Sequence, residues 1–434
     1  MKEMKDSGIS LIGLIPSTWN VTRNKNVFSC KKDVVGEASS KTQLLSLTTK
    51  GIKEKDINNA DGKLPESFDT YQIVKQNELV MCLFDLDVSA VFSGISHYDG
   101  MISPAYRVLH CKENIIPQFA DYWFRYIADG RKFNHYAKNI RYTLNYEDFS
   151  TISIVLPPLC VQIKIANYLD DKCARIDAII EKQQAVIEKL KEYKLAVITE
   201  AVTKGLNPNV EKKDSGIDWI GGIPSHWSVV KLGNIFDFLG GYAYNSDLYV
   251  SESGNQVIRI GNVKNNHMIF EANPVFISDE VARNTEKFKL KAGTILFTMT
   301  GTKGKRDYFY THLLSEKDME KHNLFLNQRV GCFIPREKIC AGYYNYLLKD
   351  NHILDSIFVY ETGTANQGNL GIDSIKRTKL HFPPVEEQVE IYEHLENMSR
   401  YIAKKIQAKQ SIIDKLFEYK KSLIYEVVTG KREV

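Results

Sequence analysis

The chain carries the same 14-residue box twice. Residues 6–19 read DSGISLIGLIPSTW and residues 214–227 read DSGIDWIGGIPSHW, so the second copy follows 208 positions after the first without a gap. Self-similarity at a fixed offset is typical of an architecture built from repeated units. The fold must therefore provide two equivalent places for this box.

A second repeat begins at a pair of prolines. The segments 156–158 (LPP) and 382–384 (FPP) correspond, and from Gln162 and Gln388 the two copies align without a gap, 226 positions apart, as far as residues 203 and 429. Proline ends a strand readily and is tolerated at the first turn of a helix. Each pair is predicted to end a strand and lead into a long helix.

Two regions between the repeats, roughly 20–156 and 228–382, barely resemble each other. The scaffold is repeated and the regions that it carries differ, as expected for a protein that presents two different surfaces on equivalent frames. We predict a first domain at 1–156, a long helix at 157–206, a linker and second domain at 207–382, and a second long helix at 383–434. If the end of the chain were joined to its beginning, each box would follow a long helix. We therefore expect the two termini to lie close together and a pseudo-two-fold axis to relate the two halves.

The two long segments have apolar residues at alternating steps of three and four, which is the heptad pattern. About 40 residues at 1.5 Å per residue give roughly 60 Å, far longer than an average helix. Helices of equal length and phase should pair with each other, antiparallel if the halves are two-fold related. The alternative is that each helix is an amphipathic layer on its own domain. The predicted pairing positions are Leu169, Ile176, Ile180, Ile187 and Leu190 with Leu395, Ile402, Ile406, Ile413 and Leu416.

The amino-acid composition limits the classes of protein to which this chain can belong. The apolar content of 43% and the charged content of 25% are ordinary for globular domains, and a net charge of +4 leaves room only for local basic patches. The seven cysteines form no CxxC pair, which argues against a disulfide framework or a zinc site and fits a reducing cytosol. The apolar run 9–15 is too short for a signal peptide, and no stretch reaches the roughly 18 apolar residues of a membrane span. We expect a soluble, cytoplasmic protein.

Both variable regions mix short β-like runs, such as 78–84 and 293–299, with helical segments, such as 119–128 and 343–354. We therefore predict two compact α+β domains. Basic, amide and aromatic side chains gather in several loops, where Arg, Asn and Gln suit base edges and Lys suits phosphates. The candidate DNA contacts are Lys50, Lys53, Lys138, Arg141, Tyr142 and Asn145 in the first domain, and Lys303, Lys305, Arg306, Tyr308, Asn327, Gln328, Arg329, Asn366, Gln367 and Asn369 in the second. Any single loop of this kind is also compatible with an ordinary solvated turn.

Motifs for catalysis are missing from the sequence. The loop at 301–305 lacks the spacing of a phosphate-binding P-loop, and Arg306 stands where that motif needs Ser or Thr. There is no GxGxxG, HExxH or EF-hand pattern, no Asn/Asp-Pro-Pro-Tyr/Phe element for adenine methyl transfer, and no metal-ligand spacing among the histidines. We expect a binding protein with no catalytic residues, no metal and no cofactor of its own.

These features resemble the specificity subunits of type I restriction–modification systems over nearly the whole chain. The resemblance is carried by the duplicated IPxxW box, the duplicated PPxxxQ lead, the helix ends at 192–194 and 418–420 (both EYK), and the loops 301–305 and 366–370. One departure is Val161, which stands where the second copy has the usual acidic residue, Glu387.

The resemblance implies a sequence-specific DNA-binding subunit with two target-recognition domains, which read the two parts of an asymmetric DNA target. Its implied partners are two modification subunits, which methylate adenine with S-adenosylmethionine, and ATP-driven restriction subunits. The alternatives are a two-headed protein-binding scaffold and a nuclease-fused specificity protein with an unrecognised active site.

Overall fold

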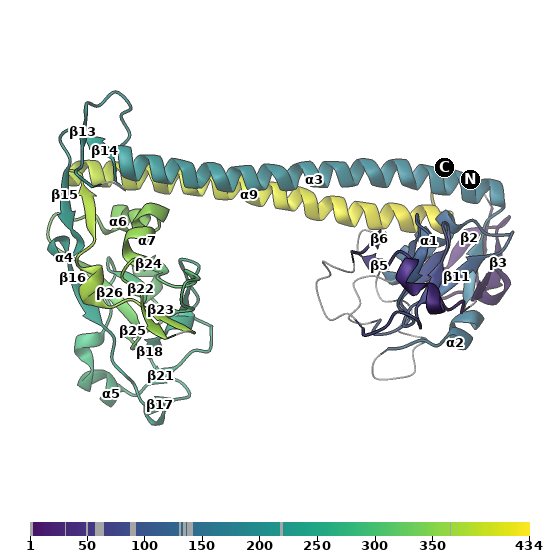
Figure 1. Ribbon diagram of the computed structural model, residues 1–434, viewed down its shortest axis with the longest axis horizontal. Coiled ribbons are helices and arrows are strands. Elements are labelled where there is room, and N and C mark those ends of the chain that lie inside the picture. The colour runs from purple at the N-terminus through teal and green to yellow at the C-terminus, as the bar shows by residue number, and fades with distance from the viewer. Residues whose placement is uncertain are drawn as a thin grey trace. The chain divides into compact units, whose positions relative to one another are not determined.

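The computed structural model describes residues 3–30, 32–48, 51–56, 65–86, 93–129, 132, 136, 142–217, 220–364 and 366–434. These residues form two compact units. Unit 1 comprises Met1–Ala185 with Lys409–Val434, and unit 2 comprises Val186–Ala408 (Figure 1). Each unit holds one box, one variable domain, the first part of one long helix and the last part of the other. The units thus cut across the linear domain boundaries expected from sequence.

Each box folds into an antiparallel two-stranded hairpin with the same register. Strand β1 (Met4–Asp6) pairs with β2 (Leu14–Pro16), and β13 (Lys212–Asp214) pairs with β14 (Gly222–Pro224). The Asp-Ser-Gly sequence explains the turn, because Asp6 Oδ1 accepts a hydrogen bond from the Gly8 N–H at 2.9 Å and Asp214 Oδ1 accepts one from Gly216 at 3.0 Å. Both glycines have a φ near +70°, which other residues rarely adopt.

The two variable domains share a four-stranded antiparallel sheet that their sequences do not reveal. In unit 1 its order is β4-β11-β8-β9, and in unit 2 it is β16-β26-β22-β24. The strands that occupy the same position in the two sheets also follow each other in the same sequence along the chain: β4, β8, β9 and β11 correspond to β16, β22, β24 and β26. The bounds are Phe28–Cys30 (β4), Leu79–Met81 (β8), Ser93–Ile95 (β9) and Arg107–Cys111 (β11), against Phe236–Gly240 (β16), Ile295–Thr298 (β22), Thr311–Leu313 (β24) and Val330–Pro335 (β26).

A second strand pair closes each domain next to the Pro-Pro lead. Strand β3 (Asn20–Arg23) pairs with β12 (Ser153–Leu156), and β15 (Ser228–Lys231) pairs with β29 (Lys379–Phe382) in the matching register. The strand after the box therefore lies beside the strand before the long helix. This arrangement brings the two ends of each variable domain together.

The remaining elements differ between the domains. Unit 1 adds β5 (Leu45–Thr48), β6 (Gly51–Glu54), β7 (Gln72–Val74), β10 (Gly100–Ile102), helices α1 (Pro117–Ala128) and α2 (Tyr146–Thr151), and 3-10 turns at Asn24–Asn26 and Gly36–Lys41. Unit 2 adds strands β17 (Tyr249–Val250), β18 (Asn255–Ile258), β19 (Val263–Lys264), β20 (His267–Met268), β21 (Phe276–Ile277), β23 (Thr300–Gly301), β25 (Asn323–Leu326), β27 (Thr362–Thr364) and β28 (Gln367–Asn369). Its helices are α4 (Leu232–Ile235), α5 (Asp279–Asn284), α6 (Ala341–Leu347), α7 (Asn351–Phe358) and α8 (Ile372–Ile375), with 3-10 turns at Ser246–Leu248, Ile260–Asn262, Glu286–Phe288 and Glu316–Met319.

Aromatic side chains fill the core of each domain. In unit 1 the rings of Phe28 and Phe124 are 5.4 Å apart, and in unit 2 those of Phe297 and Phe333 are 4.2 Å apart and stacked. All four are almost completely buried. Burial of such a side chain stabilises a fold by about 1.5–3 kcal/mol, so these rings account for much of the stability of each domain.

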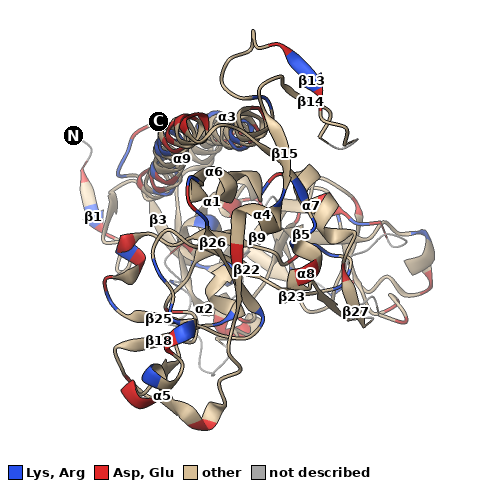
Figure 2. Ribbon diagram, turned by 90° about the vertical axis from the view of Figure 1, so that its left-hand side faces the viewer, with Lys and Arg blue, Asp and Glu red and all other residues tan. Residues whose placement is uncertain are grey.

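The long helices are α3 (Leu159–Lys204) and α9 (Val385–Val428). They begin directly after the proline pairs, and Gly205 and Gly430 follow their C-terminal ends with φ values of +76° and +71°, which are typical of a C-terminal helix cap. Both helices carry acidic and basic residues (Figure 2). Among the predicted pairing positions, Leu169, Ile176, Ile180, Ile187, Leu395, Ile402 and Ile413 are buried, and Leu190, Ile406 and Leu416 are partly buried.

Within each unit the two helix parts run antiparallel. In unit 1, Lys420 of α9 donates hydrogen bonds to both carboxylate oxygens of Asp177 on α3, at 2.7 and 2.6 Å. In unit 2, Ala201 and Val202 near the end of α3 share a core with Ile391 and Leu395 near the start of α9. The end of one helix therefore lies beside the start of the other.

The tryptophan of each box packs on the glycine that ends a long helix. A Cβ added to Gly205 would lie 3.3 Å from the Trp227 ring, and one added to Gly430 would lie 2.9 Å from the Trp19 ring. Because Gly430 is near the end of the chain and Trp19 near its beginning, this contact joins the two termini within unit 1. The expectation of neighbouring termini is thus confirmed.

The structure contains helices, sheets and two long helices, which agrees with the α+β fold class predicted from the sequence. No helix among the described residues is both long and apolar enough to cross a membrane. All seven cysteines are free thiols.

Candidate nucleic-acid interface

Three loops of unit 2 that the sequence singled out converge at one end of its sheet. The Met299 N–H donates a hydrogen bond to the Arg329 carbonyl at 2.9 Å, and the Leu370 N–H donates one to the Met299 carbonyl at 2.9 Å. Next to them, Thr300 pairs with Asn369 across β23 and β28. The segments 300–306, 327–329 and 366–369 are therefore neighbours in space, although as many as 69 positions separate them in the chain.

The first of these segments is a basic loop, residues 301–306, which is folded around a carboxylate. Glu361 accepts hydrogen bonds from the Gly304 N–H at 3.1 Å and from the Tyr308 hydroxyl at 2.7 Å. The Lys303 ammonium donates to the Gly363 carbonyl at 3.1 Å, and the side chains of Lys303 and Lys305 are exposed. The loop is thus held in shape while both ammonium groups remain accessible to an anionic ligand.

Tyr308 and Arg306 have different surroundings from those expected for DNA contacts. Tyr308 is only 3% exposed, and burial together with the nearby Glu361 carboxylate raises the pKa of its hydroxyl. Arg306 forms an ion pair with Asp355 and lies over the Phe358 ring, 5.8 Å from its centroid. Tyr308 therefore shapes the loop from inside the domain, a role that sequence alone could not distinguish from surface contact.

The second segment is the turn between β25 and β26. Asn327 is 7% exposed and its carbonyl accepts a hydrogen bond from Val330, so it serves mainly to form the turn. Gln328 and Arg329 are exposed, and Arg329 has a φ of +69°. The two long polar side chains of this turn are therefore available to a ligand.

Tyr242, which sequence analysis did not select, lies beside this turn. The Gln328 N–H donates to the Tyr242 carbonyl at 2.9 Å, and the Tyr242 side chain is 39% exposed. The close approach requires Gly241, because a Cβ there would lie 1.9 Å from the Asn327 carbonyl oxygen. The Gly240-Gly241-Tyr242 sequence was the available signal, since paired glycines before an aromatic residue indicate close backbone contact.

The third segment is a ribbon formed by β27 and β28, residues 362–364 and 367–369, which pair antiparallel. Thr362, Thr364, Gln367 and Asn369 are exposed, and Gly368 between the last two is buried. Asn366 is exposed at the turn, and residue 365 lies outside the described residues. The predicted amide-bearing loop is thus a regular β-structure with one polar face.

The candidates of unit 1 are only partly described. Lys50, Lys138 and Arg141 lie outside the described residues. Lys53 is exposed on β6, and Tyr142 is 38% exposed with a φ of +45°. Asn145 caps helix α2, because its side-chain oxygen accepts a hydrogen bond from the Asp148 N–H at 2.7 Å. This cap gives Asn145 a structural role.

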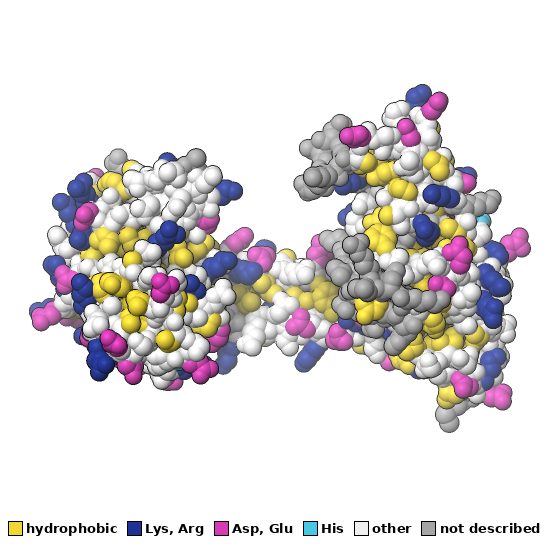
Figure 3. All heavy atoms as spheres, turned by 90° about the horizontal axis from the view of Figure 1, so that it is seen from below, with side chains coloured by type: hydrophobic (Ala, Val, Ile, Leu, Met, Phe, Trp, Pro, Cys, Tyr) yellow, Lys and Arg dark blue, Asp and Glu magenta, His cyan; other side chains and the backbone are white. Residues whose placement is uncertain are grey.

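Charge on unit 2 is mixed. On the face shown in Figure 3, Lys and Arg side chains are interspersed with Asp, Glu and hydrophobic side chains. This pattern agrees with the net charge of +4 for the whole chain. Attraction for an anionic polymer would depend on local groups such as those of the basic loop.

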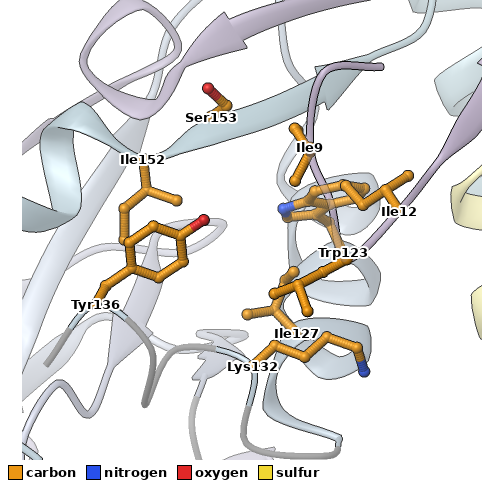
Figure 4. Close-up of a pocket in the computed structure, with 9 residues that line it drawn as sticks. Ile9, Ile12, Trp123, Ile127, Lys132, Tyr136, Ile152 and Ser153 are labelled. Atoms are coloured by element: carbon orange, nitrogen blue, oxygen red, sulfur yellow. The ribbon is translucent and has the colours of Figure 1, made fainter. Parts of the chain in front are cut away.

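A small hollow lies in unit 1 between the first box and α1. Ile9, Ile12 and Trp123 line one side, and Tyr136 and Ile152 line the other (Figure 4). At its rim, the Lys132 ammonium donates to the Tyr126 carbonyl at 3.1 Å, and burial lowers the pKa of that amine. The mostly apolar lining serves to pack the box on the domain.

No group of three or more His, Cys, Asp or Glu side chains that could hold a metal ion occurs within the described ranges. Burial lowers the pKa of His381 from 6.5 to about 4. It stacks on the Trp227 ring at 5.6 Å, so it belongs to the junction between box and domain.

Each variable domain is attached to the long helix that follows it by two equivalent hydrogen bonds. Tyr122 donates to Asp170 at 2.7 Å in unit 1, and Tyr346 donates to Glu396 at 2.8 Å in unit 2. The buried side chains of Gln162 and Gln388 supply the second bond, accepting from the backbone N–H of Ile116 and Cys340, both at 3.0 Å. The orientation of each domain on its helix is therefore defined by the same contacts.

The chain contains the same sheet, box and helix arrangement twice, and the two copies carry different exposed loops. It is therefore a duplicated protein with two different surfaces on equivalent frames. This chain is similar to type I restriction–modification specificity subunits. Residues 224–412 match the family model described as "Type I restriction modification DNA specificity domain".

The chain is 28% identical over 291 residues to the type I restriction enzyme MjaVIII specificity subunit of Methanocaldococcus jannaschii. That alignment covers 66% of this chain and 63% of the relative, so the chain spans less than two thirds of it.

Two solved structures share the fold. A chain from a study of complex assembly and conformational transition of the type I R-M system has a TM-score of 0.71 at 13% identity, covering 96% of this chain and 99% of that one. The HsdS subunit from Thermoanaerobacter tengcongensis has a TM-score of 0.53 at 14% identity, covering 96% and 98%.

Proposed function

We propose that this chain is the subunit of a type I restriction–modification enzyme that recognises duplex DNA by sequence. Each variable domain would read one part of a two-part, asymmetric target. The observation that carries the proposal is the convergence of the basic loop, the 327–329 turn and the β27–β28 ribbon on one end of the unit 2 sheet. Recognition of a DNA sequence needs two kinds of side chain close together. Lysines reach the phosphates, and amide and arginine side chains reach the base edges.

We further propose that α3 and α9 pair along their length as an antiparallel coiled coil that joins two equivalent domains. The buried heptad positions and the Asp177–Lys420 ion pair support this layout. Because unit 1 and unit 2 carry dissimilar loops on matching sheets, the two domains would read different sequences. The target would therefore be asymmetric.

The repeated helices also suggest where partner subunits bind. Equivalent positions on the two helices keep large apolar side chains in solvent: Ile163 and Val389 are 49% and 39% exposed, and Tyr193 and Tyr419 are 53% and 49% exposed. Two equivalent sites would accept two copies of one partner, namely the modification subunit. In this proposal the chain has no catalytic role, and S-adenosylmethionine and ATP are used by the partner subunits.

The purified full-length chain tests this function directly. Binding to duplex DNA should be sequence-dependent, and log Kd should rise steeply with log salt because phosphate contacts release counterions. Salt-insensitive capture of a protein without DNA binding would favour the two-headed scaffold. Cleavage of DNA by the chain alone would favour the nuclease-fused alternative.

A further inference from the structure

We infer that Tyr242, Phe288 and Lys287 form a further DNA-binding surface of unit 2. This surface, the aromatic–lysine stack, binds the phosphates of one DNA strand beside the 327–329 turn. The inference rests on the proposed function and adds to it a contact that positions the duplex without reading its bases. Lysine and tyrosine contacts to phosphates fix the register of a protein on DNA and carry no sequence information of their own.

The aromatic–lysine stack is continuous with the candidate interface. Tyr242 lies beside the 327–329 turn, because its carbonyl accepts a hydrogen bond from the Gln328 N–H at 2.9 Å. The centroid of the Tyr242 ring is 5.2 Å from that of Phe288, and the Lys287 ammonium lies 4.8 Å from the Phe288 centroid. Two rings in contact therefore connect this lysine to the turn.

Hydrogen bonds fix the segments that carry the stack to each other. The buried hydroxyl of Tyr244 donates to the Thr285 hydroxyl oxygen at 3.1 Å, directly before the 3-10 turn at Glu286–Phe288. After this turn, the Leu290 N–H donates to the Leu324 carbonyl of β25 at 2.8 Å. The rings and the lysine are thus placed before a ligand binds, which reduces the entropic cost of binding.

The polar groups of the stack are available to a ligand. Lys287 is exposed, and within the described part of the chain it contacts the Phe288 ring without forming an ion pair. Tyr242 is 39% exposed, and its hydroxyl makes no hydrogen bond to any described residue. Both groups are donors of the kind that bind phosphate oxygens.

The charge around the stack favours an anion, but only modestly. Residues 283–291 hold four basic side chains and one acidic side chain, Glu286, which pairs with Lys289 at 3.7 Å. Asp279 and Glu280 precede this segment on α5, which leaves a net charge of +1 for the whole stretch. This balance suits a single phosphate contact by one lysine, and its effect should be local because salt screens longer-range attraction.

The test compares the full-length chain with the variants Lys287→Ala and Tyr242→Phe at several salt concentrations. The ligands are a duplex that the wild type selects from a random pool and an unrelated duplex. Lys287→Ala should bind both about 5- to 10-fold more weakly at about 0.1 M salt, and the slope of log Kd against log salt should fall by about 0.9. Tyr242→Phe keeps the ring and removes only the hydroxyl. It should weaken binding to both duplexes by about 3- to 10-fold with an unchanged slope, because no charge is lost.

A second lysine over a tyrosine ring supplies matched controls. Lys405 lies over the Tyr401 ring on α9, 5.2 Å from its centroid. Lys405→Ala and Tyr401→Phe should therefore keep the wild-type affinity and slope. Duplexes in which single phosphates are replaced by uncharged methylphosphonates then locate the contact. One such replacement should weaken binding by the wild type and leave binding by Lys287→Ala unchanged.

Wild-type affinity and slope in both stack variants, with a wild-type motif clearly selected, would overturn the inference and leave the proposed function intact. A wild-type chain that binds no duplex would overturn both. Both variants should select the wild-type motif, because phosphate contacts do not read sequence. A changed motif in either variant would show that the stack contacts bases, and the inference would be wrong.

Discussion

The buried side-chain oxygen of Gln388, at the start of α9, accepts a hydrogen bond from the backbone N–H of Cys340 at 3.0 Å. The amide nitrogen of the same side chain donates to the Pro383 carbonyl at 2.9 Å. Gln162 makes the corresponding bonds to Ile116 and Pro157 in unit 1. One residue thus joins the helix, the proline lead and the domain in each half of the protein.

Gln388→Ala should lower the free energy of unfolding of unit 2 by about 2–4 kcal/mol, because two buried backbone groups would be left without hydrogen bonds. Urea unfolding followed by tryptophan fluorescence would measure the change. Gln407→Ala removes an exposed glutamine from the same helix and should change stability by less than about 0.5 kcal/mol. Equal midpoints for the two variants would show that the buried bonds contribute nothing.

Replacing Lys303 and Lys305 with Ala should weaken binding to all duplexes alike. The slope of log Kd against log salt should fall by about one for each lysine that neutralises a phosphate in the wild type. Arg306 is left in place because it pairs with Asp355 and lies over the Phe358 ring, so its removal would also change contacts inside the domain. Lys317→Ala, an exposed lysine of the Glu316–Met319 turn, serves as the control. A double variant with the wild-type slope would mean that the basic loop does not face DNA.

Stability of unit 2 should fall as the pH is lowered from 6.5 to about 4. Burial holds the pKa of His381 near 4, below its ordinary 6.5, so the unfolded chain binds the proton more readily in this range. The decrease approaches roughly 3 kcal/mol at the acidic end. Thermal unfolding of wild type and His381→Leu across this range would measure it. The variant should show a flatter pH dependence, and parallel curves would exclude His381 as the cause.

The sequence predicted the scaffold well because its signals are local. The proline pairs marked the starts of α3 and α9, Gly205 marked the end of α3, and seven of the ten heptad positions are buried. The shared four-stranded sheet could not be predicted, because its strands are three to six residues long and their sequences differ. The inward position of Tyr308 depends on Glu361, which is 53 positions away, and a linear pattern does not contain that contact.

Exchange of residues 228–382 for the equivalent region of a similar specificity subunit should change one half of the target only. Strands β15 and β29 bring the two ends of this region side by side, so the exchanged domain can be attached at the same junction. Selection from random duplexes would compare the chimera with the wild type. Changes in both halves would contradict independent reading by the two domains.

A longer helix pair should lengthen the spacer between the two parts of the target. Four residues inserted after Ala196, matched by four in α9 after Tyr401, add roughly 6 Å, which is nearly two base pairs. Four residues are close to one helical turn, so the apolar stripe is only modestly rotated. The half-site sequences should stay the same because the loops are untouched. An active variant with an unaltered spacer would show that the helices do not set the distance.

The most direct measurement is the sequence motif that the purified full-length chain selects from a random duplex pool at two salt concentrations. Our account predicts one asymmetric motif with two specified parts and an unspecified spacer of constant length, bound more weakly at the higher salt. No enriched motif, or a single continuous block of specified bases, would contradict two-domain recognition of DNA by this protein.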